Sequence, residues 1–163
     1  MILHAGFVAR RLAGRWRGVL IEGASGSGKS DLALRALDAG FRLVADDRTV
    51  VWASGDALYG RAPPVLAGLI EMRGQAIVRE PALACAEIVL VARCADDPAE
   101  IERMPLGQPK SLCGVTVPHL TLDAQALSAP ARLWRAMEHL GGAAQQAYQA
   151  SPLGGGKPRR DWG

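Results

Sequence analysis

The clearest chemical pattern in this sequence is a short run that combines glycines with a lysine and a serine. Its spacing, G-x-x-x-x-G-K-[ST], is that of a P-loop, and its residues are Gly23, Ala24, Ser25, Gly26, Ser27, Gly28, Lys29 and Ser30. Because glycines tolerate positive φ and carry no Cβ, the backbone N–H groups of such a loop can surround a phosphate at a helix N-terminus. We expect Lys29 to be exposed until it meets the β- and γ-phosphates, and the Ser30 hydroxyl to bind Mg²⁺. A plain glycine-rich turn is the alternative.

A second group that could do chemistry is the pair of consecutive carboxylates Asp46 and Asp47, directly after the apolar run 41–45. Mg²⁺ prefers oxygen ligands, and phosphoryl transfer to a hydroxyl needs a group that orients and deprotonates the nucleophile. At the carboxyl end of a strand, both residues would face bound phosphates. Since consecutive side chains point in different directions, we expect one carboxylate to be catalytic and the other structural. A solvated acidic turn is the alternative.

Glu71 and Arg73 form a third candidate group, because they follow an apolar stretch and lie on the same side of an extended chain. The acid could complete the coordination of Mg²⁺, and the guanidinium could hold phosphate oxygens. An exposed ion pair would have the same sequence.

These groups need strands and helices that bring them to one edge of a sheet. The apolar run 18–22 predicts the strand before the glycine-rich loop, and residues 30–39 have helical spacing, with Gly40 placed as a C-cap glycine. The remaining pattern predicts strands at 2–8, 41–45, 49–53, 57–59, 87–92 and 115–122, a helix at 129–140, a polar turn at 10–17 and a loop at 94–109. A strand, a glycine-rich loop and a helix in succession lead us to expect an α/β fold.

Length and composition limit the possible functions. With 163 residues, 49% of them apolar, the chain is long enough for one domain with a sizeable core. A net charge of +3 is too small to argue for a nucleic acid partner, and no apolar run approaches membrane-spanning length. The three cysteines lack metal-site spacing, which predicts reduced thiols in a cytoplasmic protein. We expect a catalytic domain at 1–142 and a largely disordered extension at 143–163.

Three blocks of this sequence resemble one family, HPr kinase/phosphorylase, whose bacterial members phosphorylate a serine of the carrier protein HPr. Residues 18–34 resemble its P-loop block, residues 40–47 its G-H-R-L-V-A-D-D block, and residues 70–77 its L-E-I-R-G-x-G-I signature. The resemblance implies a P-loop nucleotide-binding domain of the HPr kinase type, with a mixed sheet and flanking helices. It also implies an ATP- and Mg²⁺-dependent serine kinase that acts on HPr and forms a homo-oligomer, a hexamer in the family.

The resemblance also implies roles for individual residues. It makes His4 the active-site histidine, Lys29 the phosphate-binding lysine and Asp47 the group that takes the serine proton. Ser30 and Glu71 become the magnesium ligands. Beyond the resemblance, we expect Asp46 to orient the hydroxyl or a metal-bound water. Arg103, in a region of different length, is the best match to a further active-site arginine.

The sequence departs from the family pattern in places that bear on the reverse reaction. Longer members carry an N-terminal domain that is absent from this sequence, and a P-x-x-P-G-R-N element linked to phosphorolysis is missing after Leu122. We therefore expect a kinase with weak reverse phosphorolysis. A small-molecule kinase or NTPase on the same scaffold, and a nucleotide-binding regulator without catalysis, are the alternatives.

Overall fold

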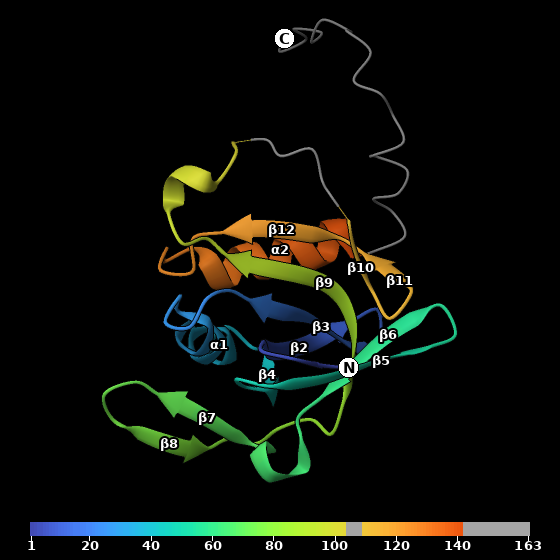
Figure 1. Ribbon diagram of the computed structural model, residues 1–163, viewed down its shortest axis with the longest axis horizontal. Helices are drawn as coiled ribbons and strands as arrows, with labels where there is room; N and C mark the ends of the chain where they lie inside the picture. The colour runs from blue at the N-terminus through green and yellow to red at the C-terminus, as the bar shows by residue number, and fades with distance from the viewer. Residues whose placement is uncertain (104–108, 142–163) are drawn as a thin grey trace, which may run out of the picture.

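The described residues form an eight-stranded mixed sheet and two separate two-stranded hairpins (Figure 1). The computed structural model describes residues 1–103 and 109–141. The sheet order is β1-β5-β6-β9-β3-β2-β4, with β12 paired to β9, and the hairpins are β7-β8 and β10-β11. The predicted α/β fold with a mixed sheet is confirmed, whereas the extension predicted at 143–163 lies outside the described residues.

The elements that the structure defines are short. The main sheet comprises β1 (Ile2–Leu3), β2 (Gly6–Leu12), β3 (Arg15–Glu22), β4 (Arg42–Ala45), β5 (Thr49–Ser54), β6 (Ala57–Arg61), β9 (Ala86–Cys94) and β12 (His119–Leu122). The hairpin strands are β7 (Leu69–Met72), β8 (Ala76–Arg79), β10 (Lys110–Leu112) and β11 (Val115–Val117). The helices are α1 (Lys29–Asp38) and α2 (Ala129–Leu140), and neither is long and apolar enough to cross a membrane.

The polar turn predicted at residues 10–17 is wrong, because β2 and β3 continue through it as one hairpin that pairs up to Leu12 and Arg15. The actual turn is the two-residue loop Ala13-Gly14, with φ of 50° and 78°, as a type I′ turn requires. Arginine side chains suit these strands because their stems can lie on apolar surface. The guanidinium of Arg10, for example, stacks 4.2 Å from the ring centre of Trp134 in α2.

Several other boundaries differ from prediction. The strand predicted at 115–122 is split into β11 and β12 by Pro118, which has no N–H for a strand ladder. The carbonyl of Pro118 instead accepts a hydrogen bond from the amide of Val91, at 2.9 Å. Strands β8 and β10 were not predicted, and each is a short strand of a separate two-stranded hairpin.

Strand β9 lies at the centre of the sheet, and its pairing determines which strands end at the same edge. One edge of β9 pairs in parallel with β3. On the other edge, its first residues pair antiparallel with β6 and its last residues pair in parallel with β12. The arrows of β3, β9 and β12 therefore point to the same side (Figure 1). The connections that follow these three strands consequently meet at one edge of the sheet.

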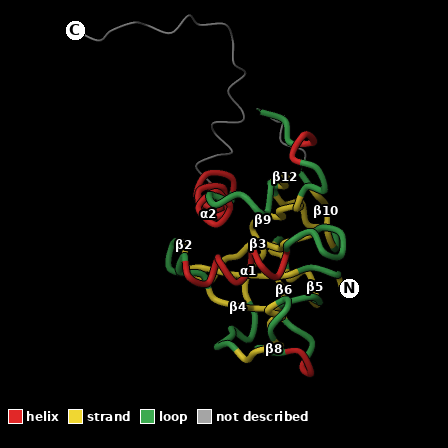
Figure 2. The backbone as a smooth tube through the Cα atoms, turned by 90° about the vertical axis from the view of Figure 1, so that its left-hand side faces the viewer, coloured by secondary structure: helices red, strands yellow, loops and turns green. Residues whose placement is uncertain are grey.

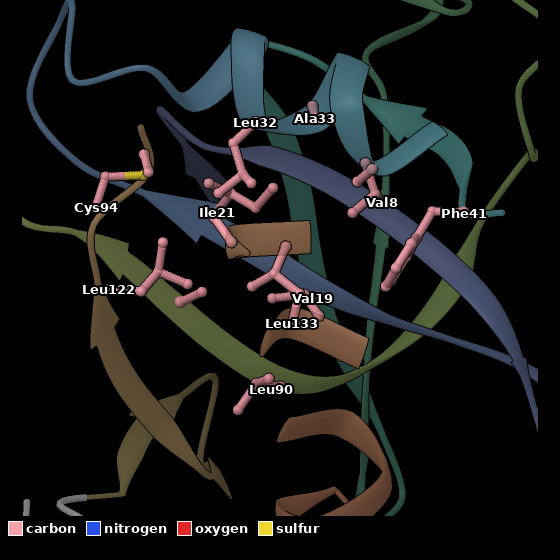
Figure 3. Close-up of a cluster of buried hydrophobic side chains, with 14 of the residues drawn as sticks. Val8, Val19, Ile21, Leu32, Ala33, Phe41, Leu90, Cys94, Leu122 and Leu133 are labelled. Atoms are coloured by element: carbon pink, nitrogen blue, oxygen red, sulfur yellow. The ribbon is translucent and has the colours of Figure 1, made fainter. Parts of the chain in front are cut away.

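Hydrophobic side chains fill both faces of the sheet. Side chains of α1 and α2, such as Leu32 and Leu133, pack with Val19 and Ile21 in one core (Figure 3). Leu20, which points to the opposite face of β3, belongs to a second core that includes β5, β6 and the β10-β11 hairpin. Figure 2 shows α2 on one side of β9 and β10 on the other.

Gly18 in β3 lies close against the backbone of β2 and the ring of Phe7, with no room for a side chain. A Cβ added at Gly18 would lie 2.7 Å from the Phe7 ring and also overlap the Val8 carbonyl oxygen. A Cβ at Gly6, in the same strand pair, would have its nearest atoms at 3.9 Å, an ordinary contact.

We predict that Gly18→Ala lowers the free energy of unfolding by about 2 kcal/mol, because the sheet must shift to accept one methyl group. Gly6→Ala is the matched control and should change it by less than about 1 kcal/mol. Urea unfolding of both variants tests this, and equal effects would contradict the assigned packing of the Phe7 ring.

Candidate functional site

The glycine-rich loop, residues 23–28, connects β3 to the first turn of α1. Gly26 and Gly28 have φ of 83° and 91°, values at which a side chain would be strained. Of the amides of residues 25–30, only that of Ser27 donates a hydrogen bond to a described residue, the carbonyl of Ala24, at 3.2 Å. Several N–H groups at the positive end of α1 are therefore available to an anion.

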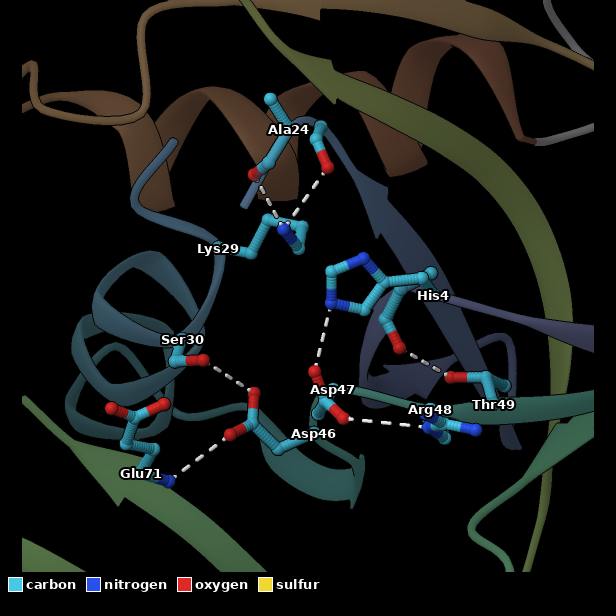
Figure 4. A network of polar contacts seen from close by, with 11 residues as sticks. His4, Ala24, Lys29, Ser30, Asp46, Asp47, Arg48, Thr49 and Glu71 are labelled. Atoms are coloured by element: carbon cyan, nitrogen blue, oxygen red, sulfur yellow. Dashed lines mark hydrogen bonds and ion pairs between the residues drawn. The ribbon is translucent and has the colours of Figure 1, made fainter. Parts of the chain in front are cut away.

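Lys29 is buried rather than exposed, so the expectation from sequence is wrong on this point. Its ammonium donates hydrogen bonds to the carbonyl oxygens of Gly23, at 3.0 Å, and Ala24, at 2.7 Å (Figure 4). A buried charge needs such partners, and the carbonyls of the loop supply them. The positive charge of Lys29 consequently lies within the loop itself.

Asp46 connects two walls of the site. Its side chain is buried, one carboxylate oxygen accepts a hydrogen bond from the Ser30 hydroxyl at 2.8 Å, and the other accepts one from the Glu71 amide at 3.0 Å. Ser30 belongs to α1 and Glu71 to β7, so this carboxylate joins the helix to the hairpin (Figure 4). Asp46 thus orients both residues that were predicted to bind a metal.

Asp47 points in another direction and has other partners. Its φ of 59° is unusual for a residue with a side chain, and the carbonyl of Asp46 accepts a hydrogen bond from the Arg48 amide across it, at 2.6 Å. The exposed carboxylate of Asp47 lies 2.8 Å from His4 Nε2 and 3.7 Å from Arg48 Nε. The tight turn therefore separates the two consecutive carboxylates and leaves that of Asp47 open to solvent.

Contacts on both sides of His4 along the chain tie this segment to the strand that follows Asp47. The buried Thr49 hydroxyl donates to the Ala5 carbonyl at 2.8 Å, and β1 pairs with β5. Sequence reasoning did not identify Thr49 as part of the site. Its position two residues after Asp47 was the available signal, but only the fold shows that it reaches Ala5.

A cavity of about 360 Å³ brings most of the predicted residues together. Beyond the glycine-rich loop, its walls include the predicted residues His4, Lys29, Ser30, Asp47, Glu71 and Arg73. Met72 and Gln75, which sequence reasoning did not identify, also line it. The guanidinium of Arg73 lies over the loop, since a Cβ at Gly26 would be 3.5 Å from its Nη1 atom.

Two predicted residues do not line this cavity. Asp46 lies behind Ser30 and accepts a hydrogen bond from its hydroxyl, as described above. Arg103 is exposed and is absent from the walls of this cavity, and the segment 104–108 that follows it lies outside the described residues.

Hard oxygen donors are available at this site for a cation. Among the described residues no group of three or more His, Cys, Asp or Glu side chains could hold a metal. The Ser30 hydroxyl and the Glu71 carboxylate nevertheless share one cavity. Mg²⁺ commonly uses only one or two protein ligands, with water and phosphate oxygens completing its shell. The donor set therefore fits Mg²⁺ better than a metal that needs a cage of side chains.

Two titratable groups on β9 and β12 have shifted pKa values. Burial raises the pKa of the Cys94 thiol. Cys94 is the last residue of β9 and belongs to the core that contains Leu32 and Leu133. Burial, and then the neighbouring Lys110 ammonium, lowers the pKa of His119. Near neutral pH the thiol is therefore protonated and the imidazole neutral. Cys85 and Cys113 are free and exposed.

Comparison with known proteins gives consistent matches. A family model described as the HPr Serine kinase C-terminal domain matches residues 15–132. An HPr kinase/phosphorylase of Lactobacillus delbrueckii subsp. bulgaricus is 32% identical over 148 residues, which cover 84% of this chain and 45% of that protein. An HPr kinase/phosphorylase of Clostridium acetobutylicum is 44% identical over 66 residues, which cover 40% of this chain and 22% of that protein. The chain thus spans less than half the length of these relatives.

A solved structure supports the same match at the level of the fold. The Hpr(Ser) kinase/phosphatase from Coxiella burnetii superposes with a TM-score of 0.70 at 26% sequence identity. The superposition covers 83% of this chain and 94% of that chain.

The left-handed backbone at Asp47 leads to a prediction about stability. Asp47→Gly and Asp47→Ala both remove the carboxylate, but only glycine adopts a φ of 59° without strain. We expect the glycine variant to be more stable than the alanine variant by about 1 kcal/mol, measured by urea unfolding. An alanine variant more stable than the glycine variant would show that the backbone at this position carries no strain, because glycine loses more conformational entropy on folding.

Proposed function

Because the chain belongs to the family of the HPr serine kinase C-terminal domain, we propose that it transfers the γ-phosphoryl group of ATP to a serine of an HPr-type phosphocarrier protein. The observation that carries this proposal is the single cavity in which Lys29, Ser30 and Glu71 meet the His4–Asp47 pair. Lys29 would be the cation that binds phosphate, and Ser30 and Glu71 would supply oxygen ligands for a metal. Asp47 would be an exposed base, with His4 as its partner. Phosphoryl transfer to a hydroxyl needs all of these groups.

We propose that the glycine-rich loop is a P-loop that holds the β- and γ-phosphates. The unpaired amides of the loop and the ammonium of Lys29 would neutralise the charge of the phosphate oxygens. To reach them, Lys29 exchanges its hydrogen bonds to the Gly23 and Ala24 carbonyls for hydrogen bonds to the nucleotide. Arg73, above Gly26, is placed to hold a further phosphate oxygen.

Ser30 and Glu71 would hold Mg²⁺ in this cavity. When bound, Mg²⁺ supplies positive charge that balances the transferring phosphoryl group. Asp46 keeps the two residues in position, because it binds the Ser30 hydroxyl and the backbone of Glu71 at once. This role corresponds to the structural one that was expected for one carboxylate of the pair.

Asp47 would act as the general base. Its carboxylate takes the proton of the acceptor serine hydroxyl while the serine oxygen attacks the γ-phosphorus and ADP leaves with the bridging oxygen. His4 Nε2, at 2.8 Å, orients the carboxylate. In the reverse direction the same carboxylate returns the proton to the serine oxygen.

The proposal is tested by incubating the protein with ATP, Mg²⁺ and purified HPr, followed by mass mapping of the phosphosite. We expect one phosphoserine on HPr and none with Lys29→Ala. Transfer to small alcohols or water instead of HPr would indicate a small-molecule kinase or an NTPase. ATP binding without any turnover would indicate a nucleotide-binding regulator.

Two further properties belong to the same proposal. A cytoplasmic location follows from an acceptor that is itself a soluble carrier protein, and a homo-oligomer, hexameric in the family, is what the resemblance implies. Measurement of the molar mass in solution tests the assembly.

The two carboxylates should respond differently to the same substitution. Asp47→Asn should lower kcat by at least about 100-fold with a much smaller loss of ATP affinity, because a general base acts on the nucleophile. Asp46→Asn should weaken Mg²⁺-dependent ATP binding, since it disturbs the partner of Ser30. Steady-state kinetics with HPr and calorimetry with ATP and Mg²⁺ measure both effects. The opposite pattern would exchange the two roles.

We also predict that kinase activity strongly exceeds phosphorolysis. Phosphorolysis needs groups that bind inorganic phosphate in line with phosphoserine, and the family element linked to that reaction is missing after Leu122. Phosphorylated HPr, incubated with phosphate and Mg²⁺, should release pyrophosphate much more slowly than the kinase reaction runs. Equal rates would show that the missing element is dispensable.

A further inference from the structure

A second cavity, of about 320 Å³, lies against the glycine-rich loop. Its walls include residues of the loop itself together with the segments that follow β9 and β12. Ser25 and Gly26 line both cavities, so the loop forms a boundary shared by the two. A molecule that binds the loop can therefore extend from one cavity into the other.

The topology accounts for the position of the second cavity. Strands β3, β9 and β12 are parallel to one another, and their carboxyl ends lie on one side of the sheet (Figure 1). Open α/β sheets bind ligands in the crevice outside such strand ends. The second cavity occupies the crevice between the segments that follow these three strands.

Hydrogen bonds hold the walls of this cavity in place. The Arg35 guanidinium in α1 donates to the carbonyls of Ala124 and, at 3.2 Å, Ala126. One carboxylate oxygen of Asp123 accepts a hydrogen bond from the Gln125 amide at 2.8 Å. The Ala95 amide, after β9, donates to the Leu122 carbonyl at 2.8 Å. The cavity is thus preformed and needs little ordering to accept a ligand.

The two cavities differ in charge. Lys29 and Arg73 line the first cavity, whereas the described residues that line the second include no lysine, arginine or histidine. The charged residues that line the second are the acids Asp96 and Asp123, and Asp96 already pairs with Arg93 at 3.6 Å. Carboxylates repel phosphates but accept hydrogen bonds from hydroxyl groups. The phosphates of a nucleotide are consequently favoured in the first cavity and its uncharged end in the second.

We propose that the second cavity binds the nucleoside end of ATP, and that Asp123 accepts a hydrogen bond from a ribose hydroxyl. The inference rests on the proposed function, since it assumes that the glycine-rich loop holds the phosphates. The second carboxylate oxygen of Asp123 accepts no hydrogen bond from the described residues, so it is free for this role. Small apolar residues, including Ala24, Ala95 and Pro98, supply the surface against which a base can lie.

The test compares the binding of ATP and inorganic triphosphate in the presence of Mg²⁺ by titration calorimetry. Wild-type protein should bind ATP at least about tenfold more tightly, because only ATP reaches the second cavity. Asp123→Asn should weaken ATP binding about tenfold and leave triphosphate binding unchanged. Asparagine keeps an oxygen that can accept from the Gln125 amide, so the turn is preserved.

Asp97→Asn is the matched control. Asp97 also accepts a hydrogen bond from the amide two residues later, that of Ala99 at 2.9 Å, but it does not line the cavity. Its substitution should change neither affinity. A comparison of 2′-deoxy-ATP with 3′-deoxy-ATP then identifies the hydroxyl, because its removal should cost nothing further in Asp123→Asn.

Gln125→Trp provides a second, steric test, because a bulky side chain at this exposed position should obstruct the cavity and weaken ATP binding only. Equal affinity of wild type for ATP and triphosphate would overturn the nucleoside site and leave the proposed function standing. Loss of triphosphate binding in Asp123→Asn would also overturn it. Failure of the wild type to bind either compound would overturn both proposals.

Discussion

The buried carboxylate of Asp46 is the interaction on which the candidate site depends. A carboxylate removed from water must have its oxygens hydrogen-bonded, and Asp46 meets this requirement with one donor from α1 and one from β7. Each donor belongs to a wall of the first cavity. The separation of helix and hairpin is therefore fixed by the span of a single carboxylate group. Asp46 contacts no substrate in the proposed function, but its hydrogen bonds determine the positions of residues that do.

The same short segment gives the consecutive residues Asp46 and Asp47 different surroundings. The turn at Asp47 directs one carboxylate inward, where hydrogen bonds hold it, and the other outward, where His4 and Arg48 approach it. In the proposed function, the base must be accessible and the supporting group must be fixed. The left-handed φ of Asp47 satisfies both requirements at the cost of some backbone strain.

Much of this site could be predicted because its signals are local in the sequence. The glycine-rich loop, α1 and the Asp46-Asp47 pair follow one another along the chain. The β2-β3 hairpin was missed because its arginines suggest solvent, although Arg17 pairs with Glu87 of the distant β9. The burial of Lys29, the role of Thr49 and the second cavity were also missed. The role of Thr49 and the second cavity depend on contacts between segments that only the complete fold brings together, as in the contact from Arg35 to the chain after β12. Lys29, by contrast, forms its hydrogen bonds within its own loop, and the loop pattern does not show their direction.

The parallel pairing of β3 with β9 also determines the order in which the chain can fold. Arg17 and Glu87 are separated by 70 positions in the sequence, whereas the β2-β3 hairpin closes over two residues. Local pairs form quickly, while distant strands must wait for loop closure and slow the overall rate. A chain emerging from the ribosome can therefore build the hairpin and the glycine-rich loop long before β9 and β12 exist. The second cavity can form only after the segments that follow β9 and β12 have been synthesised.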